Sequence, residues 1–218
     1  NAFYTKLSQR PRDFGLVSFY LTSCGLVLLL FIFFCVGLNV LNIHTYLWPD
    51  QVPLYIYLGV VWGVLSFISQ VFGKMADAYG LTVHAEFLKV LQRALGLAII
   101  IGLFLTEELD LTTLFLYHFF ILSFFSVSLV FLFSRSKFSL FQNWRLSFIQ
   151  IRKYFREFFD YCHPLVVYAF VVLIVGILDR WLLQYFSGSV QQGFFGLGFK
   201  IGAICFIFTS AMTPLIHR

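Results

Sequence analysis

Residues 16–38 read LVSFYLTSCGLVLLLFIFFCVGL, an apolar run without a charged side chain. A run of about 18 or more such residues is long enough to cross the hydrocarbon core of a bilayer as a helix. Similar runs recur along the chain, and of its 218 residues 60% are apolar, 21% aromatic and 11% charged. A soluble domain carries about 25% charged residues. The sequence therefore excludes a single soluble domain and predicts an all-α, polytopic membrane helix bundle.

Six apolar runs indicate six membrane spans. They are residues 16–38, 54–75, 94–105, 111–133, 164–186 and 193–216. The third run is too short alone, so we expect its helix to begin near His84. Lys89 and Arg93 then lie at the membrane edge, where their long side chains reach toward headgroups.

The basic side chains indicate the orientation of the spans. All fifteen lysines and arginines except Arg180 and Lys200 fall on one side of a six-span topology. The opposite side, residues 39–53, 106–110 and 187–192, holds acidic side chains but no lysine or arginine. Because short cytoplasmic loops are enriched in Lys and Arg, we predict that both ends of the chain are cytoplasmic. The net charge of +5 therefore reflects topology, and a nucleic-acid-binding face is excluded.

The segment 141–158 is neither a span nor an ordinary loop. Apolar side chains recur in it at steps of three and four, with bases between them: Phe141, Trp144, Phe148, Ile151, Phe155 and Phe158. We predict an amphipathic helix. It either lies in the cytoplasmic interface, where anionic headgroups attract bases, or packs on the bundle with a solvated charged face.

This helix divides the chain into three parts. Residues 1–133 form four spans of a first lobe, residues 134–163 a cytoplasmic amphipathic linker, and residues 164–218 the first two spans of a second lobe. Two pairs of glycines at four-residue spacing, Gly59 with Gly63 and Gly198 with Gly202, predict places where membrane helices approach closely.

Three charged side chains lie well inside the predicted spans, away from their ends: Asp179, Arg180 and Lys200. A charge at mid-bilayer costs about 2.5–3.5 kcal/mol on insertion scales, so it is retained mainly for a reason. Adjacent helical residues point about 100° apart, so Asp179 and Arg180 cannot simply neutralise each other. Asp179 and Lys200 lie at similar depth on neighbouring spans. Two interpretations follow: a buried ion pair between them, or charges that line an aqueous cavity.

The sequence has no signature of catalysis or of a bound metal. The histidines are scattered without a second ligand at helical spacing, and the four cysteines are widely and irregularly spaced. No serine stands in a nucleophile elbow. We therefore expect no catalytic residues, no metal site, no cofactor and no enzymatic activity.

The last two spans carry a recognisable pattern. It comprises YCHPL at 161–165, LDRWLL at 178–183 and GFFGLGFKI at 193–201. This resembles the polysaccharide transporter family, the O-antigen flippase type of the multidrug/oligosaccharidyl-lipid/polysaccharide exporter superfamily. The likeness is specific over residues 159–214 and loose over the first four spans. It implies that the chain is a fragment, the third to eighth helices of a two-lobed, V-shaped fold around a central cavity.

The resemblance implies a function. It is translocation of an undecaprenyl-diphosphate-linked oligosaccharide across the bacterial inner membrane for surface polysaccharide assembly, either O-antigen or capsule, as one step of lipopolysaccharide biosynthesis. Arg180, Lys200 and Asp179 are the expected cavity charges. Expected partners are the lipid-linked oligosaccharide, membrane lipids, and the glycan polymerase and chain-length machinery. The alternative is an ion-coupled drug or metabolite antiporter of the same superfamily, which favours more carboxylates at depth.

The predicted topology can be tested by cysteine labelling from outside the cell. Thr45→Cys and Glu108→Cys should react with a membrane-impermeant reagent, because both positions lie on the side without bases. Ser136→Cys should remain unlabelled. The reverse labelling pattern would overturn the orientation.

Overall fold

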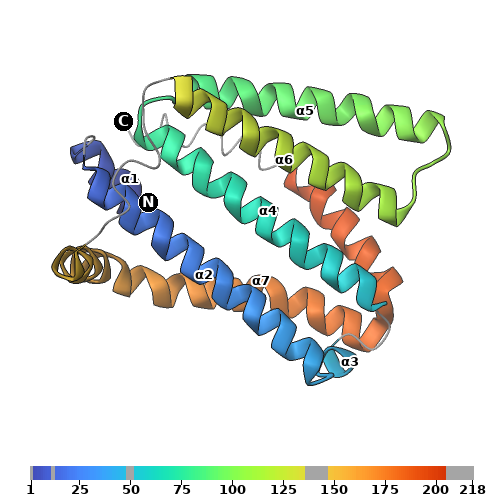
Figure 1. Ribbon diagram of the computed structural model, residues 1–218. Coiled ribbons are helices and arrows are strands. Elements are labelled where there is room, and N and C mark those ends of the chain that lie inside the picture. The colour runs from blue at the N-terminus through green and yellow to red at the C-terminus, as the bar shows by residue number, and fades with distance from the viewer. Residues whose placement is uncertain (1, 11–12, 48–51, 136–146, 205–218) are drawn as a thin grey trace. The chain divides into compact units, whose positions relative to one another are not determined.

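The computed structural model describes residues 2–10, 13–47, 52–135 and 147–204. These ranges consist of helices and the turns that join them. In chain order the helices are α1 (Ala2–Gln9), α2 (Phe14–Val40), α3 (His44–Leu47), α4 (Pro53–Ala78), α5 (Thr82–Leu105), α6 (Leu111–Arg135) and α7 (Phe148–Ala203) (Figure 1). The predicted all-α membrane fold is confirmed. Five helical stretches are long and apolar enough to cross a membrane: α2, α4, α5, α6 and Val166–Ala203 of α7.

Local sequence explains where several of these helices begin and end. α2 begins after Asp13, whose carboxylate accepts a hydrogen bond of 3.1 Å from the Leu16 amide. α4 ends at Ala78, and Gly80 just beyond it takes the left-handed conformation with φ 73°. The amide of Leu81 donates back to the Ala76 carbonyl at 2.9 Å, a Schellman ending. α5 then begins at Thr82, close to the predicted start near His84.

The chain divides into two compact units. The first comprises residues 1–41 and 52–163, and the second comprises residues 42–51 and 164–218. Within the first unit, α4 packs against α1, α2, α5 and α6, and its most extensive contact is with α6. Figure 1 shows α5 and α6 running side by side along α4. α4 is therefore the helix to which the others of this unit attach.

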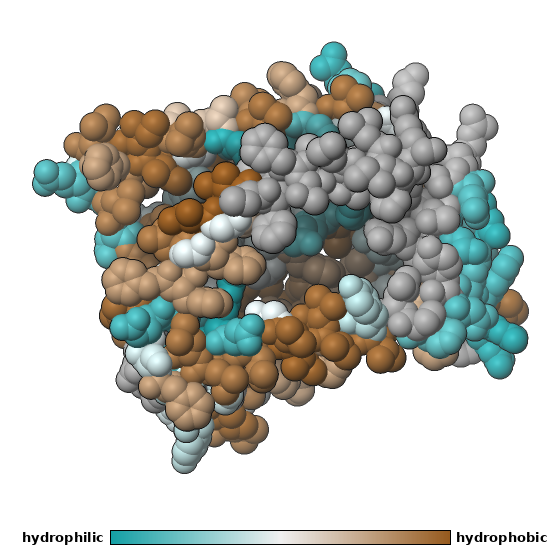
Figure 2. All heavy atoms as spheres, turned by 180° about the vertical axis from the view of Figure 1, so that it is seen from behind, coloured by the Kyte–Doolittle hydropathy of each residue, from teal (hydrophilic) through white to brown (hydrophobic). Residues whose placement is uncertain are grey.

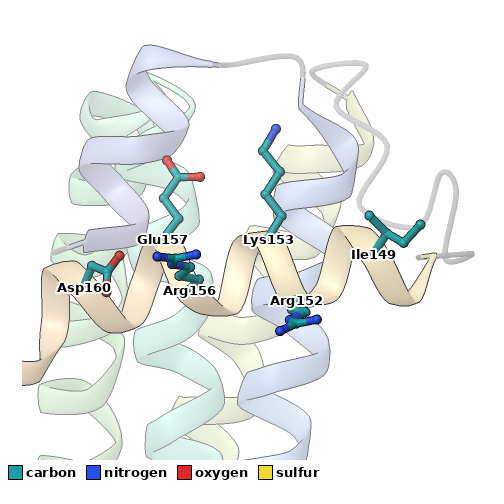
Figure 3. A pocket seen from close by; sticks show the side chains of 6 residues that line it. All are labelled: Ile149, Arg152, Lys153, Arg156, Glu157 and Asp160. Atoms are coloured by element: carbon teal, nitrogen blue, oxygen red, sulfur yellow. The ribbon is translucent and has the colours of Figure 1, made fainter.

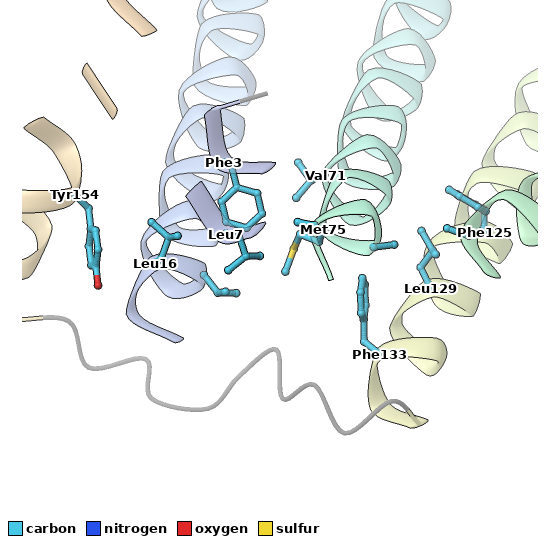
Figure 4. Packing of buried hydrophobic residues seen from close by; sticks show 13 residues of the cluster. Phe3, Leu7, Leu16, Val71, Met75, Phe125, Leu129, Phe133 and Tyr154 are labelled. Atoms are coloured by element: carbon cyan, nitrogen blue, oxygen red, sulfur yellow. The ribbon is translucent and has the colours of Figure 1, made fainter. Parts of the chain in front are cut away.

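A cluster of buried side chains holds these helices together at one end of the first unit. Phe3 and Leu7 of α1, Leu16 of α2, Met75 of α4, and Leu129 and Phe133 of α6 meet there (Figure 4). Leu7, Leu16, Met75, Leu129 and Phe133 are fully buried. Away from this cluster the helices expose large apolar side chains, such as Leu29, Phe33 and Phe104, and apolar residues cover much of the described surface in Figure 2. That surface suits a lipid solvent.

The first part of α7 corresponds to the predicted amphipathic linker, of which residues 141–146 lie outside the described residues. Its buried face contains Tyr154 and Phe158, which pack against the cluster. The Tyr154 hydroxyl donates to the Asp13 carboxylate at 2.9 Å. Phe155 is 62% exposed, although the predicted apolar stripe included it. The helix thus packs on the bundle through a face rotated from the predicted one and leaves its basic residues exposed.

α7 contains the described part of the last two predicted spans. The predicted connection over residues 187–192 is shorter than expected: two helices meet at Gly188, with φ 84° and ψ 171°, and the residues around it are helical. A straight helix of the 38 residues Val166–Ala203 would measure about 57 Å, far more than the ~30 Å hydrocarbon core. The break at Gly188 divides this stretch, and the sixth predicted span is described only up to residue 204.

Close helix contacts involve other glycines than the predicted pairs. Among the described residues, a Cβ added at Gly59 would meet nothing within 4 Å, and one added at Gly63 would meet only Phe31, at 4.0 Å. A Cβ added at Gly198 or Gly202 would also meet no described atom. At Gly96 of α5, however, an added Cβ would lie 2.7 Å from the Tyr117 hydroxyl of α6. Gly96 is therefore where α5 and α6 approach closely.

Valine at Gly96 should destabilise the first unit. Its side chain would collide with Tyr117, and overpacking of this kind costs about 1–3 kcal/mol. Gly102→Val is the matched control, because the same change in the same helix meets no neighbour. We expect Gly96→Val to have the lower thermal unfolding midpoint in detergent, and Tyr117→Phe to restore part of the loss. Equal midpoints for the two valine variants would contradict close packing at Gly96.

Candidate functional site

The three charges predicted to act at membrane depth all lie on α7, in the second unit. Asp179 and Arg180 precede the break at Gly188, and Lys200 follows it. All three side chains are exposed in the described structure. The Arg180 guanidinium lies over the ring of Phe199, with Cζ 5.4 Å from the ring centroid. This is a cation–π contact, an interaction that offsets part of the desolvation of a base in an apolar setting.

Asp179 lies in a groove beside the break. The groove has a volume of about 440 Å³, and its other lining residues are Leu182, Leu183, Phe186, Ser187 and Phe195. Among the described residues that line it, Asp179 is the only charged one. The groove can therefore accommodate a largely apolar group with a single charged contact.

Asp179 and Lys200 do not form an ion pair in the described structure. Arg180 likewise has no carboxylate partner there. Of the two interpretations of these charges, the buried pair therefore lacks its defining contact. The geometry leaves both bases available to an anion and the Asp179 carboxylate available to a donor or a cation.

A second group of polar side chains was missed by the sequence analysis. It lies in the first unit, between α4, α5 and α6, and includes Ser66, Gln70 and Asp77 of α4 with Gln92 and Arg93 of α5. The signal was present in the sequence, because polar residues recur at steps of three and four along the second half of the second apolar run. A search for charged residues alone does not detect such a stripe of polar side chains.

The first part of α7 presents a basic groove of about 650 Å³, lined by Ile149, Arg152, Lys153, Arg156, Glu157 and Asp160 (Figure 3). Figure 3 shows Lys153 and Glu157 on one side of the helix and Arg152 on the other. Glu157 accepts from Lys6 at 3.0 Å and from Arg10 at 3.4 Å, which ties α1 to α7.

The ionisable groups at this contact have shifted pKa values. The hydrogen bond from Lys6, aided by the charges of Lys6 and Arg10, lowers the pKa of Glu157. The contact therefore stabilises the fold above the ordinary pKa of a glutamate and loses this contribution as pH falls through the lowered value. Burial, followed by the hydrogen bond to Asp13, raises the pKa of Tyr154 to about 12. The tyrosine thus remains a neutral donor throughout the physiological range.

The described residues contain no group of three or more His, Cys, Asp or Glu side chains placed to bind a metal ion. Cys24, Cys35 and Cys162 are free thiols. Cys205 lies outside the described residues.

Comparison of the chain with protein-family models, with curated proteins and with solved structures found no match.

The contacts around α7 predict different couplings for its charges. Arg180 and Phe199 touch, whereas Asp179 and Lys200 are not paired. A double-mutant cycle of thermal stability with Arg180→Met and Phe199→Leu should therefore give a coupling of about 0.5–2 kcal/mol. The parallel cycle with Asp179→Asn and Lys200→Met should be additive within about 0.5 kcal/mol. Strong coupling in the second cycle would restore the ion-pair interpretation.

Proposed function

We propose that this protein is a flippase. It moves an undecaprenyl-diphosphate-linked oligosaccharide from the cytoplasmic to the outer leaflet of the bacterial inner membrane during assembly of O-antigen or capsule. The observation that carries the proposal is the exposure of Asp179, Arg180 and Lys200 on the otherwise uncharged stretch Val166–Ala203 of α7, without an ion pair among them. Charges retained at such depth have a use that outweighs their insertion cost.

The chemistry of these residues suits the head of such a substrate. A diphosphate and its sugars must cross about 30 Å of hydrocarbon. Arginine binds phosphate oxygens through two parallel hydrogen bonds, and lysine adds a compact positive charge. Arg180 and Lys200 would hold the diphosphate, while Asp179 would accept hydrogen bonds from sugar hydroxyls. The apolar faces of the spans would contact the lipid tail and the bilayer.

Two further observations support the proposal. The segments 161–165, 178–183 and 193–201 resemble the O-antigen flippase type of the polysaccharide transporter family. The bases outside α7's span fall on one side of the topology, which favours cytoplasmic ends for the chain. Alternating access around a midplane site, as in other transporters built from two lobes, would then carry the substrate across. The proposed partners are the lipid-linked oligosaccharide, membrane lipids, and the glycan polymerase and chain-length machinery.

Removing the bases should abolish transport without removing the protein. In cells whose surface glycan depends on this protein, we expect Arg180→Ala and Lys200→Ala each to lower surface glycan about tenfold or more, as loss of a charge-assisted phosphate contact does. Membrane abundance, measured by immunoblot, should stay unchanged because neither base has an ion-pair partner among the described residues that its removal would leave unpaired.

Arg152→Ala serves as the matched control, since it removes an exposed base from the first part of α7. It should leave surface glycan at the level of the unchanged protein. Normal glycan export by both span variants would reject the flippase proposal. Loss of protein from the membrane would instead indicate that the two bases act in folding.

A further inference from the structure

A polar cavity of about 320 Å³ lies between α4, α5 and α6 in the first unit. This volume is at the lower end of the ~300–1,000 Å³ typical of ligand sites. Bases and amides from two helices dominate its polar lining: Gln70 and Lys74 of α4, with Lys89, Gln92 and Arg93 of α5. The composition is unlike that of a gap between lipid-facing helices, which apolar side chains would fill.

The cavity extends along α4 from the end of the helix toward its middle. Ser66, Gln70, Gly73 and Asp77 line it at steps of three and four, so they share one face of α4. At 1.5 Å per residue the distance from Ser66 to Asp77 is about 16 Å, roughly half of the ~30 Å hydrocarbon thickness. A ligand could thus enter at the membrane surface and remain in contact with α4.

The lining carries a positive charge. Lys74, Lys89 and Arg93 stand against Asp77 alone, which gives three positive charges minus one negative, or +2. Lys74 lies 3.8 Å from Asp77, and Lys89 pairs with Glu86, which is not part of the lining. Arg93 has no ion pair among the described residues. Its guanidinium is therefore the base most in need of an anion.

Several polar groups of the cavity already have partners within the protein. Ser69 donates to the Leu65 carbonyl at 2.8 Å and lies 2.9 Å from the Ser126 hydroxyl. Gln92 donates to the Ile121 carbonyl of α6 at 3.3 Å, which fixes the orientation of its amide. Lys89 donates to Glu86, and Lys74 lies near Asp77. Arg93 is the base of the lining for which the described residues provide no carboxylate partner.

Gly73 shows that the space is open. The residue is buried and lines the cavity. A Cβ added there would nonetheless meet nothing within 4 Å. There is therefore room for a Cβ at position 73, at the edge of the cavity.

We propose that this cavity binds a phosphate group, carried either by the diphosphate of a lipid-linked substrate or by the headgroup of an anionic phospholipid. Three bases suit a group that bears more than one negative charge, and the Arg93 fork matches two phosphate oxygens. The amides of Gln70 and Gln92 complete the polar surroundings. The site uses none of the residues assigned to transport, so it does not require the proposed function to be correct.

The test measures binding to the purified protein in nanodiscs. In one arm, inorganic diphosphate is titrated into phosphatidylcholine nanodiscs by calorimetry. In the other, phosphatidylglycerol is included, and the lipid retained by the protein is counted by native mass spectrometry. Binding in the first arm assigns the site to a substrate-type diphosphate, and binding in the second arm alone assigns it to a lipid headgroup.

Two variants and one control locate the binding. Arg93→Gln removes the unpaired base, and Gly73→Leu fills the cavity while leaving every base in place. Each should weaken binding of the responsive probe about tenfold or more. Arg135→Gln removes a base of α6 that does not line the cavity and should bind normally. Thermal unfolding checks that all three variants are folded.

Three results would overturn the proposal. One is binding of neither probe to the unchanged protein, and another is an equal loss of binding in the Arg135→Gln control. The third is a folded Gly73→Leu variant that binds as well as the unchanged protein, which would place the phosphate elsewhere. Because these are binding measurements, they are independent of surface glycan export, which tests the transport proposal.

Discussion

The packing of α4 against its neighbours is the contact on which the first unit depends. Lipid tails are as apolar as leucine, so helices in a bilayer associate through close packing and hydrogen bonds rather than through the hydrophobic effect. α4 meets this requirement with small buried residues, such as Ser69 and Ala76, along the half that faces its neighbours. The Ser69 hydroxyl reaches Ser126 of α6 at 2.9 Å. Without this helix, α1 and α2 would have little with which to join α5 and α6.

A further small residue of α4 creates room for polar groups. Where Met75 and Ala76 face the apolar cluster, α4 is fully buried. A few residues away, Gly73 leaves open space that the side chains of Gln70 and Asp77 share with bases of α5. One helix thus combines a structural face and a polar face. Substitutions on α4 will therefore change helix packing or the cavity according to the face on which they fall.

The sequence predicted the elements of the fold better than their contacts. The bounds of α2, α4, α5 and α6 follow from apolar runs, because a run must be long enough for its helix to cross the hydrocarbon core of the bilayer. Contacts between helices are harder to predict, because periodicity shows which residues share a face but not which helix that face meets. The linker therefore packs through Tyr154 where the apolar stripe had included Phe155, and α5 approaches α6 at Gly96, outside the predicted glycine pairs. The cavity was missed for the same reason, since its lining comes from three helices.

The exposed charges of α7 limit what can surround that helix. From Val166 to Ala203 its most apolar window has no buried residue, so valine, isoleucine and phenylalanine side chains need lipid or further protein around them. Asp179 and Arg180 lie in the same stretch, and contact of either with lipid would cost about 2.5–3.5 kcal/mol at mid-bilayer. The two residues point about 100° apart, so a single narrow polar contact cannot serve both. A water-filled space along this side of α7 would meet both demands, and the proposed passage of a polar lipid headgroup across the membrane requires such a space.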